Sequence, residues 1–545
     1  MGYAMSHFVF RKHDNVGAPA AEHDEQFLAD CYVDTGDIEL LLNRENPKRI
    51  IVGRTGAGKT ALLYHLTHSG NHVVQLSPHD LSLNFIATNK VIAFFEEAGV
   101  NLSPFYVLLW KHLLVVELIK SKYHIKDESS YNTFKRSISA IVRKKDRNKE
   151  LALDYFEKWG EKFWLTTEQR IHELTKRVED SLTAGSDVKF MGLSLNAEAA
   201  RKLTQEERIE IKEHGLDAVS KVQIRELDNM LAVLEENIFD DSKDPYYVAI
   251  DMLDEDWADE RIKFKLIRSL IDVVNRFQQL SNVKIVLAIR QDLLYKVHHL
   301  ESAAGFQEEK YKALYLNIKW SKEELERIVE LRINKLIKNH YTKDSVCFKD
   351  VFPDHVDKED SFDYMLNRTF YRPRDIIMFV NECLELCSGK PAITANIIKA
   401  AEGNYSVERL QSLSYEWKTI LPDLAQTSRL LSGLKDRFEV SQITEGYLHA
   451  RFEEIAYHLA PGSTDPITRI LNGLYSDKGG NFESARSYIL REFFAVGLVG
   501  IKTGPTDSLC WTQVNNPRLV AGQVRPSSTV VIHPMFHRAL GIRLN

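Results

Sequence analysis

The sequence predicts an α/β fold in which a parallel sheet is covered by helices on both faces. Short apolar runs, which are typical of buried strands, recur at 49–53, 72–76, 246–250, 283–289 and 313–318. Segments of helical period separate them, and strands that alternate with helices indicate a parallel sheet with both faces buried. A glycine-rich loop joins the first apolar run to the first helical segment.

That loop, residues 53–60, has the complete pattern G-x-x-x-x-G-K-[ST]. Its glycines allow a tight turn that points backbone N–H groups inward, and these groups and the helix N-terminus hold the β- and γ-phosphates of a nucleotide. Lys59 would neutralise phosphate charge, and the Thr60 hydroxyl would ligate Mg²⁺. The flanking strand and helix are the context that the motif requires. We therefore predict ATP and Mg²⁺ as cofactors, with the binding residues Gly53, Arg54, Thr55, Gly56, Ala57, Gly58, Lys59 and Thr60.

Acidic residues follow the apolar run at 246–250, and hydrolysis needs an acid near the metal and a group that orients water. Ligands of open α/β sheets lie at the carboxyl ends of strands, so Asp251 should face the loop and hold Mg²⁺ through water. Asp254 or Glu255 would polarise the attacking water. The alternative is that this acidic cluster is a solvated loop.

Three arginines are candidates for stabilising charge on the transferred phosphate. Arg290 directly follows the run at 283–289, where a cation would lie near the γ-phosphate. Arg372 and Arg374 flank Pro373 at the predicted start of a helix, since proline is favoured in a first helical turn. The alternatives are a surface arginine at 290, and a cap or a structural ion pair at 372 and 374.

Composition limits the class of protein. The 545 residues are 44% hydrophobic and 27% charged with a net charge of −6, as in an ordinary soluble globular protein. This charge does not indicate DNA or RNA binding, which would need a local basic patch. No apolar run of about 18 residues is free of charge, so we expect no membrane association. Five scattered cysteines without a C-x-x-C pair predict a reducing compartment, and we expect a cytoplasmic protein without structural zinc.

The organisation along the chain follows from changes in pattern. Residues 121–225 are rich in charge, poor in glycine and helical in period, so they read as a helical insertion with a solvated surface. Beyond 416, helices precede short strands at 492–501, 509–512 and 529–533, an order like that of a winged helix. The predicted parts are a loose N-terminal arm (1–25), the first half of the core (26–120), the insertion (121–225), the second half of the core (226–319), a helical lid (320–415) and a winged-helix-like domain (416–545).

These motifs resemble a known group of proteins. The pattern D-x-x-D-E at 251–255 resembles the second nucleotide motif of NACHT and related STAND ATPases, and Arg290 resembles their sensor arginine. The segment 372–375 resembles the sensor-two segment of AAA+ and STAND relatives. Over about 26–415, the course of motifs resembles bacterial P-loop ATPases near the NACHT, KAP and initiator-type AAA+ groups.

The resemblance implies an AAA+/STAND-like P-loop NTPase core with strand order 5-1-4-3-2, a helical lid and a C-terminal winged helix. It also implies an ATP-driven switch that forms a homo-oligomer, and many related bacterial proteins act in antiphage defence. Such proteins usually carry a fused effector and a sensor array of repeats. This chain has neither, so we expect a separate effector or sensor protein as its partner.

Three classes of function stay open. An ATPase switch that assembles with partner proteins predicts nucleotide-dependent oligomerisation. An initiator-like DNA-binding ATPase predicts salt-sensitive binding to duplex DNA. A nucleotide-binding scaffold with little turnover predicts bound nucleotide without phosphate release. In the C-terminal domain, Lys and Arg barely exceed Asp and Glu, which favours protein contact or lid control over DNA reading.

Overall fold

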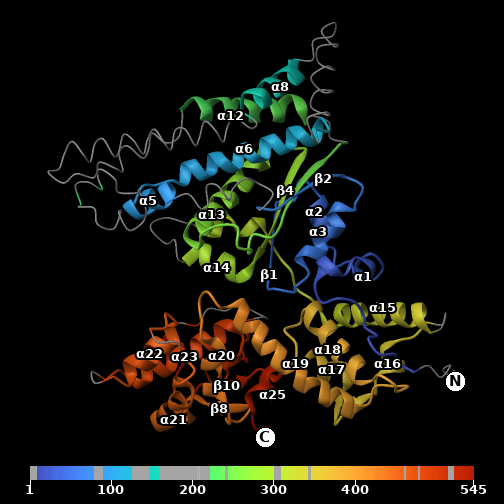
Figure 1. Ribbon diagram of the computed structural model, residues 1–545, viewed down its shortest axis with the longest axis vertical. Coiled ribbons are helices and arrows are strands. Elements are labelled where there is room, and N and C mark those ends of the chain that lie inside the picture. The colour runs from blue at the N-terminus through green and yellow to red at the C-terminus, as the bar shows by residue number, and fades with distance from the viewer. Residues whose placement is uncertain are drawn as a thin grey trace. The chain divides into compact units, whose positions relative to one another are not determined.

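The computed structural model divides into two compact units, which Figure 1 shows with the chain coloured from blue to red. The sheet unit comprises residues 34–54 and 59–318, and the C-terminal unit comprises residues 1–33, 55–58 and 319–545. The residues that the structure describes are 9–78, 90–125, 147–159, 205, 208, 221–239, 244–299, 308–341, 345–459, 462–476, 479–512, 519 and 521–544.

The sheet unit is built on a five-stranded parallel sheet of order β2-β3-β4-β1-β5. Read from the other edge, this is the predicted order 5-1-4-3-2, so the α/β prediction is confirmed. The central strand β4 pairs with β1 so that Gly53 lies opposite Arg290, at the carboxyl ends of both. The strands are β1 (Ile50–Gly53), β2 (His72–Leu76), β3 (Tyr246–Ile250), β4 (Val283–Arg290) and β5 (Tyr315–Asn317).

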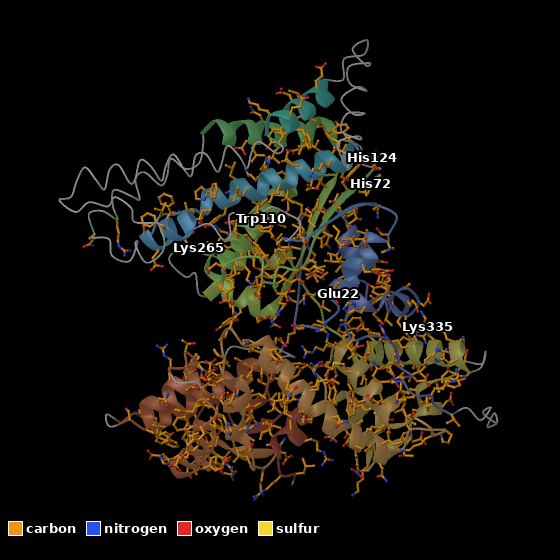
Figure 2. The ribbon with its side chains drawn as sticks, viewed as in Figure 1. Glu22, His72, Trp110, His124, Lys265 and Lys335 are labelled. Atoms are coloured by element: carbon orange, nitrogen blue, oxygen red, sulfur yellow. The ribbon has the colours of Figure 1, made fainter. Side chains whose placement is uncertain are left out.

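Helices cover both faces of this sheet (Figure 1). Alternate residues of each strand point to opposite faces, so apolar side chains on both faces need helices to bury them. Ile50 and Val52 pack against one set of helices, whereas Ile51 packs against the other. Trp110, labelled in Figure 2, is fully buried on the first face and donates to the Leu266 carbonyl at 2.8 Å. The first set is α5 (Lys90–Ala98), α6 (Ser103–Lys122), α13 (Glu260–Arg276) and α14 (Gln291–His299); the second is α2 (Asp37–Leu42) and α3 (Lys59–Thr67).

The described helix α8 (Arg147–Trp159) lies in the predicted charged insertion, and α12 (Lys221–Val233) begins in it and continues beyond its predicted end at residue 225. Both pack on α6, where the Tyr155 hydroxyl lies 2.9 Å from Nδ1 of His112. A π-helical turn, η3 (Leu234–Ile238), leads from α12 toward β3. Apart from 205 and 208, residues 126–146 and 160–220 lie outside the described residues, so the extended insertion stays a prediction.

The C-terminal unit is mainly helical, and a single hydrophobic core runs through it. Ile376 and Phe379 of the predicted lid belong to the same core as Phe493 and Phe536 of the predicted last domain. The two predicted parts are thus packed as one body. Its first helices are α15 (Lys322–His340), α16 (Phe348–Val351), α17 (Ser361–Leu366), α18 (Pro373–Leu386) and α19 (Ala395–Glu416), with a small hairpin of β6 (His355–Val356) and β7 (Glu359–Asp360).

Residues 9–25 are packed into this unit, which corrects the expectation of a loose arm for that part of the segment 1–25; residues 1–8 lie outside the described residues. Phe10 and Val16 are buried in the hydrophobic core, with 1% and 0% of their surface exposed. Asp24 forms a buried ion pair with Arg332 at 2.5 Å. The sequence did not predict this packing, because the segment is mostly polar and only a few of its side chains are buried. Its helices are η1 (Ala21–His23) and α1 (Glu25–Asp30).

The last part of the chain holds a three-stranded antiparallel sheet of order β8-β10-β9. The predicted strand 492–501 is corrected: α23 continues to Val496, Gly497 ends it at φ +92°, and only then does the strand begin. The predicted strand 509–512 is reduced to one bridge between Cys510 and Ile501. The elements are α20 (Leu424–Thr427), β8 (Arg437–Glu439), α21 (Glu445–Ala456), α22 (Pro466–Leu474), α23 (Phe482–Val496), β9 (Val499–Lys502), β10 (Thr529–Ile532) and α25 (His537–Leu540).

Candidate nucleotide site

The glycine-rich loop connects the end of β1 to the start of α3, as its pattern predicts. Gly56 and Gly58 have φ angles of +78° and +99°, which only glycine adopts without strain. The Lys59 ammonium donates to the carbonyls of Gly53 at 3.1 Å and Arg54 at 3.2 Å, so it is folded over its own loop. This is the position from which a lysine reaches phosphates held by the loop.

The first acidic residue after β3 lies beside the loop-to-helix junction. The Thr60 hydroxyl donates to Oδ2 of Asp251 at 3.0 Å, although 191 positions separate the two residues. The parallel sheet explains this proximity, because it brings the carboxyl ends of β1 and β3 to the same edge. The two residues that we predict to be metal ligands are therefore neighbours in the structure.

The surroundings of Asp251 affect the pKa of its carboxyl group and hold that group in position. Burial raises the pKa of this carboxyl, against hydrogen bonds from Met252 and Thr60 and the charge of Lys59, which lower it. The Met252 N–H donates to Oδ1 at 2.8 Å, and Met252 itself has a φ of +62°. Left-handed backbone is unfavourable for methionine and is a feature of functional sites. The backbone therefore turns sharply at Met252, and in this turn the Met252 N–H holds the Asp251 carboxylate in place.

Arg290 is held by two carboxylates. Its Nε and Nη2 donate to the two oxygens of Asp292 at 2.9 and 2.8 Å, and its Nη1 lies 3.2 Å from Asp254. The Arg290 side chain is only 18% exposed and is paired with both oxygens of Asp292, so it differs from the solvated surface arginine that was the alternative to a phosphate contact. Asp254 and Glu255 are both exposed, and the N–H of Glu255 donates to the Met252 carbonyl at 3.3 Å. Their roles toward water and phosphate stay predictions.

Arg372 and Arg374 are engaged by the protein itself. Arg372 is buried, and its Nε donates to Asp375 at 2.8 Å while its Nη1 donates to the Thr55 carbonyl at 2.5 Å. Arg374 donates through Nε to the Pro19 carbonyl at 3.2 Å, and burial lowers the pKa of its guanidinium. These contacts agree with the alternative of a structural role for the two arginines. Arg372 also contacts the glycine-rich loop itself, through the Thr55 carbonyl.

Sequence reasoning missed Trp320. Its indole N–H donates to the Ala57 carbonyl at 2.8 Å, and its ring lies 3.4 Å from the position that a Cβ on Gly58 would occupy. It immediately precedes Ser321, the N-cap of α15, whose capping box with Glu324 is visible in the sequence. A tryptophan one residue before a cap carries no motif, so only the contact identifies it.

The residues present fit a nucleotide with its magnesium ion. The buried Thr55 hydroxyl in the loop has no hydrogen-bond partner among the described residues, and a ligand oxygen would satisfy it. In the described part of the chain, no group of three or more His, Cys, Asp and Glu side chains could hold a metal. Mg²⁺ in nucleotide sites needs only one or two protein oxygens beside phosphates and water. Thr60 and Asp251 would supply them.

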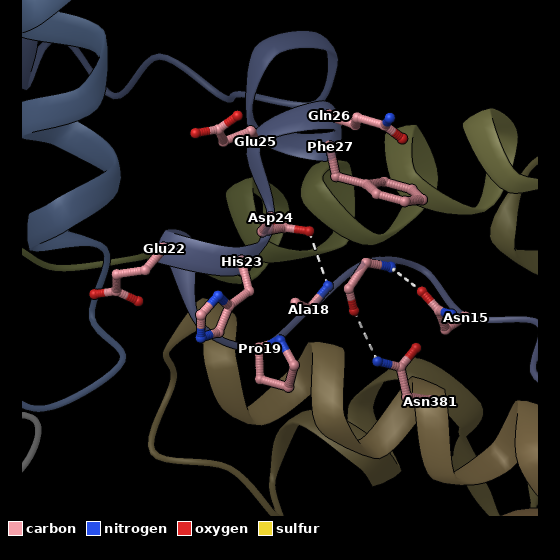
Figure 3. A pocket seen from close by; sticks show the side chains of 11 residues that line it. Asn15, Ala18, Pro19, Glu22, His23, Asp24, Glu25, Gln26, Phe27 and Asn381 are labelled. Carbon is pink, nitrogen blue, oxygen red and sulfur yellow. Dashed lines mark hydrogen bonds between the residues drawn. The ribbon is translucent and has the colours of Figure 1, made fainter.

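The C-terminal unit also contains an open cavity of about 640 Å³ beside the N-terminal segment (Figure 3). Backbone and side-chain bonds shape its wall: Ala18 donates to Asp24 at 2.8 Å, and Asn381 donates to the Gly17 carbonyl at 2.9 Å. Its lining holds carboxylates but neither lysine nor arginine, so it is unsuited to phosphate groups. It is lined by Asn15, Gly17, Ala18, Pro19, Glu22, His23, Asp24, Glu25, Gln26, Phe27 and Asn381.

The sheet order, the loop between β1 and α3 and the carboxylate after β3 together define a P-loop NTPase fold. In addition, none of the described helices combines the length and the apolar character that crossing a membrane requires.

Comparison with known proteins adds three similarities. A family model described as the FunZ-associated C-terminal helical domain matches residues 323–414, which lie within the predicted lid and run from α15 to α19. The chain is 21% identical over 550 residues to the Escherichia coli K12 protein named "Putative transposon gamma-delta 80.3 kDa protein", covering 98% of this chain and 68% of that protein. A solved structure, the Walker-type ATPase of Pyrococcus abyssi, aligns with 93% of this chain and 98% of its own at 12% identity and a TM-score of 0.32.

Proposed function

We propose that this chain binds ATP with Mg²⁺, hydrolyses it and acts as a nucleotide-dependent switch. The observation that carries this proposal is the 3.0 Å contact between Thr60 and Asp251, directly behind a complete phosphate-binding loop. A phosphate loop by itself supports binding. A buried carboxylate at the metal position also supports hydrolysis, since it is the second element that nucleotide hydrolysis requires.

Each residue has a distinct task in this proposal. The loop N–H groups and Lys59 hold the β- and γ-phosphates, while Thr60 and Asp251 hold the metal. ATP with bound Mg²⁺ supplies the phosphoryl group that is transferred to water. Asp254 or Glu255 accepts a proton from that water; both are exposed at the same strand end as Asp251. Arg290 stands opposite Gly53 in the sheet and would act on phosphate charge only after leaving Asp254 or Asp292.

Single substitutions of the three carboxylates distinguish a role in metal binding from a role in hydrolysis. We expect Asp251→Ala to weaken Mg²⁺-dependent ATP binding, because it removes the oxygen that Thr60 contacts. Glu255→Gln or Asp254→Asn should leave binding nearly intact and slow hydrolysis on the order of 10²-fold, whichever is the base. Titration calorimetry and single-turnover phosphate release measure the two effects. Wild-type protein that binds no ATP would overturn the proposal, and full hydrolysis in both latter variants would place the base elsewhere.

We further propose that nucleotide controls self-assembly of the chain into a homo-oligomer. Two glycines of the phosphate loop, Gly56 and Gly58, adopt positive φ, so the loop is a segment whose conformation a bound nucleotide could fix. A nucleotide shifts an assembly equilibrium when it binds one of the two states more tightly than the other, which is what a conformational switch needs.

The oligomeric state tests this. Multi-angle light scattering of the protein without nucleotide, with ADP and with ATP plus Mg²⁺ should show different masses, and Lys59→Ala should keep the nucleotide-free mass in all three. A single mass for wild-type protein under every condition, at micromolar concentration, would contradict a switch that works through assembly.

The last domain is better suited to contact protein than to read DNA, and we propose that it or the charged insertion docks a separate effector or sensor. Its strand order, β8-β10-β9 with helices between β8 and β9, supports a winged-helix arrangement. In that arrangement α23 would be the reading helix. Its two basic side chains are engaged internally, since Arg486 pairs with Glu483 and Arg491 donates to the Leu519 carbonyl at 3.0 Å. The relative named after a transposon would favour DNA contact, but α23 lacks the basic face that phosphates require.

A further inference from the structure

Three consecutive carbonyls of the phosphate loop are each held by a donor from the C-terminal unit. The Thr55 carbonyl accepts from Nη1 of Arg372 at 2.5 Å, and the Gly56 carbonyl accepts from the backbone N–H of Arg374 at 3.4 Å. The Ala57 carbonyl accepts from the indole N–H of Trp320 at 2.8 Å. Loop tip and donors all belong to the same compact unit.

We propose that these donors form a carbonyl clamp, defined as Trp320, Arg372 and the backbone N–H of Arg374, which sets the loop in its phosphate-binding conformation. Each peptide unit is planar, and its C=O and N–H point in opposite directions. Fixing the carbonyls of residues 55, 56 and 57 therefore fixes the N–H groups of residues 56, 57 and 58. These are donors of the kind that hold the phosphates in such loops.

The loop needs an external constraint. Gly56 and Gly58 have access to many backbone conformations, so the free loop would lose entropy on ordering. The clamp constrains the loop before nucleotide arrives. The clamp residues also pack closely against the loop glycines. A Cβ at Gly56 would lie 2.5 Å from Cβ of Arg374, and a Cβ at Gly58 would touch the Trp320 ring. A preorganised loop binds phosphate at a lower entropic cost.

The clamp is itself anchored. Asp375, which is fully buried, accepts from Arg372 at 2.8 Å, from Arg409 of α19 at 2.9 Å and from the Phe370 N–H at 3.0 Å. Glu416 lies 3.7 Å from Nη1 of Arg372. Tyr371, just before Arg372, has a φ of +53°, so the chain turns sharply to deliver the arginine. Arg372 is thereby a positioning residue that acts on the loop backbone.

This clamp gives the proposed switch a means of regulation and rests on the proposed nucleotide binding. A partner that shifts α15 or α18 would release the carbonyls and lower nucleotide affinity. By linkage, nucleotide would oppose that shift to the same extent. Nucleotide affinity would thus depend on the conformation of the C-terminal unit through the hydrogen bonds to the carbonyls of residues 55, 56 and 57.

The test uses two matched tryptophan variants of the full chain. Trp320→Phe keeps an aromatic ring against Gly58 and removes the indole N–H. Trp417→Phe is the control, because the buried indole N–H of Trp417 has no hydrogen-bond partner among the described residues. Hydrogen–deuterium exchange of peptides covering 53–60 is measured without nucleotide, and the Kd of a non-hydrolysable ATP analogue with Mg²⁺ is measured by calorimetry.

We expect Trp320→Phe to speed exchange in the loop peptides and to raise Kd about tenfold, the effect of one hydrogen bond. Trp417→Phe should match wild type in both. Wild-type exchange and wild-type Kd in Trp320→Phe would overturn the clamp. If no variant, nor wild-type protein, binds the analogue, nucleotide binding fails instead. In that case faster loop exchange in Trp320→Phe would still support the clamp, and unchanged exchange would overturn it.

Discussion

Replacing Lys59 with alanine is expected to abolish tight ATP binding and to lower turnover by at least about 10²-fold, as when a charge-stabilising donor is removed from a reaction centre. The Lys59 ammonium lies over the loop, bonded to the Gly53 and Arg54 carbonyls, and it is the cation that the motif directs at phosphate. Calorimetry with ATP and Mg²⁺ and steady-state phosphate release measure the loss.

The fold should tolerate this change, because Lys59 belongs to none of the hydrophobic clusters of the sheet unit. Exposed Lys312 offers a matched control, since Lys312→Ala removes the same charge from the same unit away from the loop. The melting temperature should be similar for both variants, and only Lys59→Ala should lose nucleotide. If Lys59→Ala binds and hydrolyses ATP as the control does, the loop is not a phosphate site.

Asp375→Ala is expected to destabilise the C-terminal unit by about 3–5 kcal/mol, the usual effect of removing one partner of a buried ion pair. The Asp375 carboxylate is fully buried between Arg372 and Arg409, which are also buried. Its loss leaves two buried guanidinium groups without their shared counter-charge. The hydrogen bond from Arg372 to the Thr55 carbonyl should weaken at the same time, because, among the described carboxylates, Arg372 would keep only the longer contact with Glu416 at 3.7 Å.

A surface ion pair in the same unit provides the control. Asp30 is exposed and lies 2.7 Å from Lys335, so Asp30→Ala should cost at most about 1 kcal/mol. Urea unfolding followed by circular dichroism compares the two variants. Equal midpoints for both would show that the Asp375 cluster contributes no more than a surface pair.

The same cluster predicts a direction for acid sensitivity. Burial by itself would raise the pKa of Asp375, but the charges of Arg372 and Arg409 and the hydrogen bonds outweigh it and lower the pKa below the ordinary value. A carboxyl with a lowered folded pKa contributes stability above its unfolded pKa of about 4 and loses it as pH falls through the folded pKa. Below about pH 4, the difference in unfolding free energy between wild type and Asp375→Ala should therefore shrink.

The local sequence pattern was sufficient to predict the phosphate loop and the strands of the sheet. The phosphate loop is eight contiguous residues between an apolar run and a helix, so its conformation follows from near neighbours and from glycine's access to positive φ. The five strands of the sheet were also predicted, since buried parallel strands read as continuous apolar runs. Their order came from the resemblance to known ATPases. The position of Asp251 followed from both, because the carboxyl ends of parallel strands share one edge.

Contacts between distant segments decided the rest. Arg372 and Thr55 are 317 positions apart, and nothing in either segment indicates that a guanidinium holds a loop carbonyl. Trp320 has no motif, the packing of residues 9–25 depends on Arg332 and Asn381, and the strand at 437–439 forms only beside β10. By itself, then, the sequence determined a phosphate loop and the strands of a parallel sheet. The tertiary structure alone decided which groups hold that loop, because a hydrogen bond depends on where two segments meet and carries no local periodicity.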